Sequence, residues 1–239
     1  MRYPRVIAHR GGGGLAPENT LAGLRLAARL GCKGVEFDVM LSADGVPVLI
    51  HDETLERTTD GRGPVAAQSF AALRALDAGG RHGAAYRGEP IPALDEVLAL
   101  CAELGLWANV EIKPSAGRDA ETGAVVGRML AARWDGDGVV SSFSAPALAA
   151  ARETAPQFDF AVLADAIPAD WRQRLAAGAC RAWHCRADAD AAAIAAVAAA
   201  GVPLACYTVN DRATAERLFA AGVAAVFTDR PDLWAPGEM

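Results

Sequence analysis

Short apolar runs rich in β-branched residues alternate with helix-like segments along nearly the whole 239-residue chain. The runs predict nine strands, at residues 6–9, 35–39, 46–51, 108–112, 139–142, 158–163, 181–185, 203–208 and 225–228. Helical patterns lie between most of them, at residues 20–30, 93–104, 120–133, 145–154, 187–200 and 212–220. Asn19 precedes the first helical pattern and is expected to cap that helix. Such alternation is typical of a parallel sheet covered by helices.

Nine strands are one too many for a (β/α)8 TIM barrel, the fold that the alternation and the chain length favour. Only residues 40–45, which include Asp44 and Gly45, separate the second predicted strand from the third. A crossover between parallel strands needs a dozen or more residues, so this short connection predicts a hairpin. We therefore expect residues 46–51 to return antiparallel beside residues 35–39, and the other eight strands to close the barrel.

The segment after the hairpin, at approximately residues 52–90, has no clear strand–helix rhythm and is rich in Gly, Arg and Thr. A long irregular segment in a compact domain usually carries function. No linker and no repeat beyond the alternation divides the chain. The sequence therefore predicts a single barrel domain over residues 1–239 with one insertion.

The net charge of −6 and the pI of about 5.3 limit the partners of the chain. Broad binding to nucleic acid or to anionic membranes requires a basic surface, so both are disfavoured. A negatively charged small-molecule substrate would instead need a local positive site, such as a bound cation. The sequence leaves homo-oligomer formation open.

The five cysteines are odd in number and lie within apolar patterns, at Cys32, Cys101, Cys180, Cys185 and Cys206. Cys180 and Cys185 lack a second tight pair, which argues against a zinc site. Buried thiols in a reducing compartment are the simplest interpretation. No signal-like segment follows Met1, and no apolar run approaches membrane-spanning length. We therefore expect a cytoplasmic protein without stable membrane insertion.

Polar residues recur where the predicted barrel strands end, which is where the reactive groups of such barrels gather. Glu36 and Asp38 are two residues apart and share one side of a strand, as do Glu111 and Lys113. If that side is the interior, three carboxylates converge, and buried like charges require a cation between them. Oxygen ligands suit Mg²⁺ or Ca²⁺. The alternative is that these charges face the surface, but interior barrel strands are normally apolar on both faces.

His9 and His51 also end predicted strands, and imidazole titrates near neutral pH. They are therefore candidates for a general acid and a general base, although a lone histidine at such a position is more often structural. Arg10 and Lys113 could hold phosphate oxygens, or could simply pair with carboxylates. The glycine run at residues 11–14 is either a phosphate cradle or a turn, and its spacing does not match a nucleotide-binding motif.

The chain contains, in this order, AHRGGGGLAPENT, GVEFDVMLSADGVPVLIHDETLERTTDG, NVEIKP, SSFS, YTVN and VFTDRPD. This series resembles the motifs of bacterial glycerophosphodiester phosphodiesterases, most closely those of the cytoplasmic form associated with glycerol-3-phosphate uptake. The resemblance extends from Ile7 to Asp232. It implies a (β/α)8 barrel with an insertion after the second motif, in agreement with the strand–helix pattern.

The resemblance also implies roles for individual residues. Glu36, Asp38 and Glu111 would bind a divalent metal, and His9 and His51 would form the catalytic pair. The arginine and lysine named above would then contact the phosphate.

Three further candidates for substrate binding lie in these motifs. Asn19 would position the site, although capping of the first helix explains it equally well. Phe143 and Tyr207 lie at strand ends and would line a glycerol pocket, with core packing as the alternative. For His184 and Asp229, which are also near strand ends, structural roles are favoured over catalytic ones. A surface position is expected for His82.

The function implied is metal-dependent hydrolysis of glycerophosphodiesters to glycerol 3-phosphate and an alcohol, by histidine acid–base catalysis. One rival is a lysophospholipid-directed or ring-forming phosphodiesterase on the same barrel, which would need an apolar entrance. A second is a non-catalytic glycerophosphodiester-binding protein, which the presence of His9 and His51 disfavours. A third, a metal-dependent amidohydrolase, would want several histidine ligands, and the chain has only four histidines.

Overall fold

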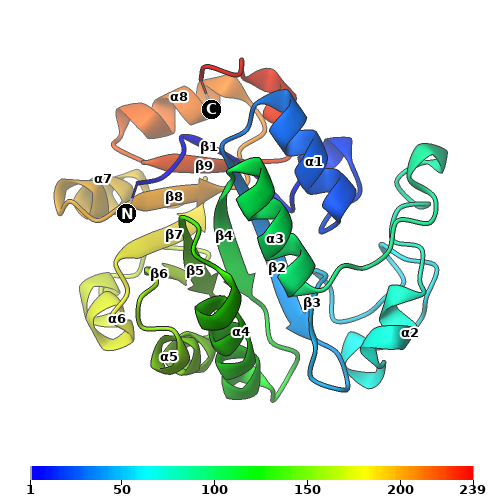
Figure 1. The fold of residues 1–239 in the computed structure, drawn as a ribbon. Helices are drawn as coiled ribbons and strands as arrows, with labels where there is room; N and C mark the ends of the chain where they lie inside the picture. Colours follow the sequence, from blue (N-terminus) through cyan, green and yellow to red (C-terminus); the bar gives the residue numbers. More distant parts are fainter. Residues whose placement is uncertain (1, 239) are drawn as a thin grey trace.

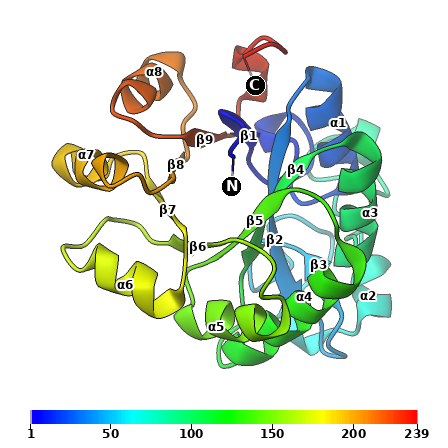
Figure 2. The ribbon, with the colours of Figure 1, turned by 60° about the vertical axis from the view of Figure 1, so that its left-hand side comes forward.

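The computed structural model describes residues 2–238, in which nine strands are surrounded by helices (Figures 1 and 2). The strands are β1 (Val6–Ala8), β2 (Gly34–Leu41), β3 (Pro47–Leu49), β4 (Trp107–Ile112), β5 (Gly138–Ser142), β6 (Phe160–Leu163), β7 (Ala182–Arg186), β8 (Leu204–Tyr207) and β9 (Ala225–Thr228). All except β3 are parallel, and the ring closes because β1 pairs with both β9 and β2. The predicted (β/α)8 barrel is confirmed.

The strand β3 lies outside the ring, as the short connection before it predicts. It pairs antiparallel with β2, with Val39 opposite Leu49 and Leu41 opposite Pro47. This hairpin extends β2 beyond the barrel and carries the chain toward the cavity residue His51. The insertion that follows lies beside β3, away from α5 to α8 (Figure 1).

The helices are α1 (Leu21–Leu30), α2 (Phe70–Arg74), α3 (Leu94–Leu104), α4 (Asp119–Arg133), α5 (Ala145–Thr154), α6 (Trp171–Gly178), α7 (Ala191–Ala199) and α8 (Arg212–Ala220). The prediction lacked α2 and α6. In α6 only Trp171 and Leu175 are buried, which is too short an apolar stripe to stand out. The expected start of α7 at residue 187 is also wrong, because the Asp190 side chain accepts from the backbone of Ala193 and begins the helix later.

Thr20, rather than Asn19, caps α1. The Thr20 hydroxyl accepts a hydrogen bond from the Gly23 amide at 3.1 Å. Asn19 has a φ of 57°, in the left-handed region that asparagine tolerates better than most residues. Its predicted capping role is wrong because its side chain is bonded to Asp38 instead.

Apolar residues form separate layers inside and outside the ring. The outer layer packs the strands against the helices, and the interior is filled by a second cluster. That cluster consists of Ile7, Trp107, Val139, Ala161, Ala182, Ala205, Ala225 and Phe227. Small alanines leave room for Trp107 and Phe227, as expected for a tapered barrel interior. This closed floor means that a ligand can enter only from the opposite end.

The insertion has an apolar core of its own, which it shares with the hairpin. The buried members are Met40, Val48, Ile50, Leu55, Val65, Leu73, Ala78 and Ile91. This packing holds an otherwise irregular segment in a defined position at the edge of the barrel mouth.

All five cysteines are buried, and the described residues form no disulfide, as the sequence predicts. Among residues 2–238, no helix combines the length and the apolar character needed to cross a bilayer.

Candidate active site

A cavity of about 550 Å³ opens where the parallel strands end. The candidate residues that line it are His9, Arg10, Glu36, Asp38, His51, Glu111, Lys113, Phe143 and Tyr207. Asn19 is the one candidate outside the lining, and it lies behind Asp38. The fold therefore brings together residues from β2, β4 and β8 and from the segments after β1, β3, β4 and β5.

The three carboxylates Glu36, Asp38 and Glu111 converge inside the barrel mouth. Each offers an oxygen within 4.8 Å of the others, and all three side chains are buried. The pairing of Asp38 with Glu111 across β2 and β4 produces this convergence. Burial and the neighbouring Asp38 charge raise the pKa of Glu36 and of Glu111 above the ordinary range. A cation would relieve this repulsion, and Glu36 Oε1 has no hydrogen-bond partner among residues 2–238, so the set fits a hard divalent ion.

Arg10 follows β1 in a turn that places it in contact with the carboxylates. Its φ is 52°, and its backbone N–H donates to Glu36 Oε2 at 2.8 Å. The Arg10 Nε lies 3.8 Å from Asp38 Oδ2 and is buried with no hydrogen-bond partner among the described residues. An unsatisfied guanidinium N–H at this place is suited to a phosphate oxygen.

The glycine run after Arg10 is a tight turn. The amides of Gly11, Gly13 and Gly14 donate to backbone carbonyls of Glu36, His9 and Asp229. A Cβ on Gly13 would lie only 2.5 Å from the Asp229 carbonyl oxygen, and its φ of +60° also favours glycine. With these amides already bonded, the turn interpretation is preferred over the phosphate cradle.

Asp38 is held on several sides. The Asn19 amide donates to Asp38 Oδ2 at 2.8 Å, and Asn19 Oδ1 accepts from the Asp38 backbone N–H at 3.0 Å. Lys113 Nζ lies 3.6 Å from Asp38 Oδ1. Asn19 thus orients a candidate metal ligand, while Lys113 adds a cation to the cavity lining.

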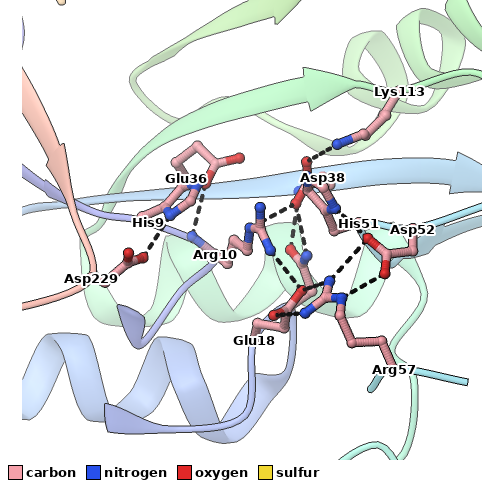
Figure 3. A network of polar contacts seen from close by, with 11 residues as sticks. His9, Arg10, Glu18, Glu36, Asp38, His51, Asp52, Arg57, Lys113 and Asp229 are labelled. Carbon is pink, nitrogen blue, oxygen red and sulfur yellow. Dashed lines mark hydrogen bonds and ion pairs between the residues drawn. The ribbon is translucent and has the colours of Figure 1, made fainter. Parts of the chain in front are cut away.

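Both candidate histidines are oriented by a carboxylate. His9 Nδ1 lies 2.7 Å from Asp229 Oδ1, and His51 Nδ1 lies 2.6 Å from Asp52 Oδ1 (Figure 3). With Nδ1 donating in each pair, Nε2 is left to exchange a proton with a ligand. His9 Nε2 is 3.9 Å from Glu36 Oε2, so this ring borders the carboxylate cluster.

The two imidazoles differ in their surroundings. Burial alone would lower the pKa of His9, but its hydrogen bond to Asp229 and the charge of Glu36 raise it overall. For His51, burial lowers the pKa and the nearby Arg10 and Lys113 add to that effect. The pKa of His9 is therefore raised and that of His51 is lowered, and an acid–base pair requires two pKa values that differ in this way.

Phe143 and Tyr207 occupy the opposite side of the cavity. Their rings meet edge to face at a centroid distance of 6.3 Å, and the Tyr207 hydroxyl donates to the Ala164 carbonyl at 3.0 Å. Phe143 is 54% exposed, so core packing does not explain it. The pair supplies an apolar surface that faces the charged residues.

Four acidic or basic side chains belong to this network although the sequence did not assign them to it. They are Glu18, Asp52, Arg57 and Asp229 (Figure 3). Asp229, for which a structural role was favoured, orients His9 directly. Two features of the sequence could have indicated two of these residues: Asp52 is adjacent to His51, and Asp229 comes just after the last strand. His184 belongs to the cavity lining but is fully buried and bonded to Tyr3, and His82 is exposed in the insertion.

Comparisons with known proteins identify the family of the chain. The family model described as "Glycerophosphoryl diester phosphodiesterase family" matches residues 9–233. A glycerophosphodiester phosphodiesterase of Caldanaerobacter subterraneus is 32% identical, with 95% of this chain and 94% of the relative covered. An Oleispira antarctica phosphodiesterase, solved with the product sn-glycerol-3-phosphate, is 41% identical with a TM-score of 0.93, over 96% and 94% of the chains. A glycerophosphodiester phosphodiesterase of Agrobacterium tumefaciens is 31% identical with a TM-score of 0.77, over 97% and 98%.

Proposed function

The chain belongs to the glycerophosphoryl diester phosphodiesterase family, and on that premise we propose that it hydrolyses glycerophosphodiesters to glycerol 3-phosphate and an alcohol with a divalent cation. The assignment to this family from the motifs, and with it the prediction of an enzyme, is confirmed. The narrower likeness to the cytoplasmic form stays a prediction.

One observation carries the proposal: two carboxylate-oriented histidines flank a buried carboxylate cluster in a single cavity that also contains Arg10 and Lys113. Phosphodiester cleavage requires neutralisation of phosphate charge, a base for the nucleophile and an acid for the leaving alkoxide. The cavity offers a group for each need. A site for binding alone would not require the two histidine–carboxylate pairs.

Glu36, Asp38 and Glu111 would hold the cation, Mg²⁺ or Ca²⁺, which when bound polarises a phosphate oxygen and offsets developing negative charge. Arg10 and Lys113, which lie 3.8 and 3.6 Å from Asp38, would bind phosphate oxygens. One histidine takes the proton of the nucleophile at Nε2, and the other donates a proton to the leaving oxygen.

The test is release of glycerol 3-phosphate from glycerophosphocholine, followed by ³¹P nuclear magnetic resonance. Activity should vanish with chelator and return with Mg²⁺ or Ca²⁺. Turnover that is indifferent to chelation, or restored by Zn²⁺ alone, would contradict the metal assignment. A cyclic phosphate as the final product would favour the ring-forming rival.

The lysophospholipid-directed rival needs an apolar entrance long enough for an acyl chain. Phe143 is the one large hydrophobic side chain that is strongly exposed among residues 2–238. A single exposed ring does not form such an entrance. Glycerophosphocholine should therefore be cleaved faster than its lysophospholipid counterpart, and the reverse order would support the rival.

A further inference from the structure

Arg57, a residue of the insertion, bridges two carboxylates beside the cavity (Figure 3). Its Nε and Nη2 donate to the two oxygens of Asp52 at 2.5 and 3.0 Å. Its Nη1 and Nη2 donate to the two oxygens of Glu18 at 2.7 and 2.8 Å. One planar guanidinium thus makes a forked contact with each carboxylate, a geometry that lysine cannot reproduce.

Each of these carboxylates also bonds a residue that lines the cavity. Asp52 Oδ1 accepts from His51 Nδ1 at 2.6 Å, and Glu18 Oε1 accepts from Arg10 Nη1 at 3.0 Å. Arg57 itself is not part of the cavity lining. Its hydrogen-bonded connections to the cavity therefore run through Asp52 to the histidine and through Glu18 to the arginine.

The charge of Arg57 lowers the pKa of both carboxylates, so each accepts its hydrogen bonds as a carboxylate. Its hydrogen bond holds the pKa of Asp52 far below the usual range. For Glu18, partial burial would raise the pKa, but the hydrogen bond from Arg57 and the charge of Arg10 lower it. An ionised, doubly anchored Asp52 fixes the ring orientation and the tautomer of His51. An ionised Glu18 fixes the direction of the Arg10 guanidinium.

Surface ion pairs typically contribute only about 0–1 kcal/mol to stability, and the Arg57 side chain is 47% exposed. Its removal should therefore leave the fold intact. Catalysis is far more sensitive, since a misplacement of about 1 Å in a reacting group can lower a rate by about 10²-fold. The forked contacts are thus better explained by positioning than by stability.

We propose that Arg57 is a positioning residue for the reaction, which holds Asp52 and Glu18 in place and through them orients His51 and Arg10. The long insertion then has a definite role, because it delivers this guanidinium to the edge of the barrel mouth. The inference rests on the proposed function and extends it to a residue that does not touch the cavity.

The test compares Arg57→Ala, Arg57→Lys and the control Arg212→Ala in the full chain. Arg212 also makes a two-point contact, to Glu238, and its side chain is 45% exposed, but it lies outside the network around the histidines. Arg57→Ala should lower kcat by about 10- to 100-fold, with partial recovery on addition of guanidinium ion. The kcat of Arg57→Lys should lie between those of the wild type and Arg57→Ala. The kcat of Arg212→Ala should match that of the wild type within about twofold, the scale of surface substitutions.

Nuclear magnetic resonance of the four histidine rings in the metal-free protein supplies a readout that a general loss of structure would not mimic. In Arg57→Ala the ring signals of His51 should shift while those of His9, bonded to Asp229, stay in place. Equal kcat in Arg57→Ala and Arg212→Ala, or equal shifts at both histidines, would overturn the proposal. A wild type inactive on glycerophosphodiesters would refute the proposed function instead, and the ring spectra would still test the positioning role.

Discussion

The two sides of the cavity lining differ in chemistry. The side formed by β1, β2 and β4 and by the segment after β3, the charged wall, contains His9, Arg10, Glu36, Asp38, His51, Glu111 and Lys113. The side formed by the ends of β5, β6, β8 and β9, the apolar wall, consists of Phe143, Leu163, Tyr207 and Phe227. One charged pair lies within the apolar wall, at the end of β7, where Arg186 and Asp188 neutralise each other through two hydrogen bonds.

This difference reflects the cost of burying charge. A buried carboxylate must be paired, hydrogen-bonded or bound to a cation, so the charged wall is cross-linked by Asn19, Lys113 and Arg10. The apolar wall needs no such partners and packs directly on the alanine-rich floor. The division implies that the charged wall binds phosphate and performs the chemistry, while the apolar wall only contacts the organic part of the substrate. Substitutions on the two walls should therefore differ greatly in effect.

The largest effect is expected from Glu36→Gln, which removes a charge from the carboxylate cluster at nearly constant volume. A bound metal contributes several kcal/mol to charge stabilisation, so kcat should fall by about 10³-fold or more. Calorimetry should show weakened binding of Mg²⁺ or Ca²⁺. Asp170→Asn, which alters a surface pair with Arg174, is the matched control. Unchanged metal affinity in Glu36→Gln would remove this residue from the ligand set.

The next largest loss of kcat is expected from substitution of the two candidate histidines. His9→Ala and His51→Ala should each lower kcat by about 10²- to 10⁴-fold, the usual range for a positioned acid or base. Metal affinity should survive in both variants. The double variant should lose less than the product of the two single effects, because the pair acts as a unit. Near-normal kcat in either single variant would make that histidine structural.

The barrel could be predicted because its signals are local. The short connection at residues 40–45 forces a hairpin, and the apolar runs place each remaining strand to within a few residues of its observed bounds. The two missed helices lack such signals. In α2 only Leu73 is buried, and that residue packs into the core of the insertion, which no local periodicity reveals. The capping prediction for Asn19 is wrong because asparagine is favoured both at helix N-caps and in left-handed backbone, and the sequence does not distinguish the two.

The candidate site residues that lie on strands or at strand ends could be predicted, but the partners that orient them could not. The two-residue spacing of Glu36 and Asp38 is enough to place them on one face. The partner of His9, in contrast, is 220 residues away in the sequence, and Arg57 reaches Glu18 across 39 residues. Such pairs depend on how the closed barrel and the insertion meet. No pattern in one segment contains that information.

A smaller effect, on stability, tests the floor beneath the two walls. His184 is fully buried, bonded to Tyr3 and packed against Phe227, and burial lowers its pKa to about 3. The ordinary pKa of histidine is 6.5, so below that pH His184 binds a proton in the unfolded chain but not in the folded chain. The stabilisation is complete above pH 6.5 and is lost as the pH falls toward 3.

Between pH 7 and pH 5 the loss should be about 2 kcal/mol, from a limit of about 1.4 kcal/mol per pH unit. Urea unfolding of the wild type and of His184→Asn at both pH values measures this loss of stability. The other titrating groups contribute equally to the pH dependence of the two proteins. The wild type should lose more stability on acidification than the variant. Equal losses would mean that His184 is hydrated or charged in the folded state.

The smallest effect is expected on the apolar wall, at Phe143. Burying a whole phenylalanine side chain contributes about 1.5–3 kcal/mol, and a ring that is already about half covered can gain only about 1 kcal/mol from a substrate. Phe143→Ala should therefore raise KM for glycerophosphocholine about fivefold. Because the ring would contact ground state and transition state alike, kcat should stay within about twofold of the wild type.

Phe219→Ala is the control for this substitution, since Phe219 stacks with Arg5 outside the cavity. It should change neither kinetic constant. An unchanged KM in Phe143→Ala would remove this ring from the substrate-binding set. A fall in kcat of about 10²-fold, the size expected for an acid–base group, would have a larger consequence. The apolar wall would then take part in the chemical step, and the division of labour between the two walls would be wrong.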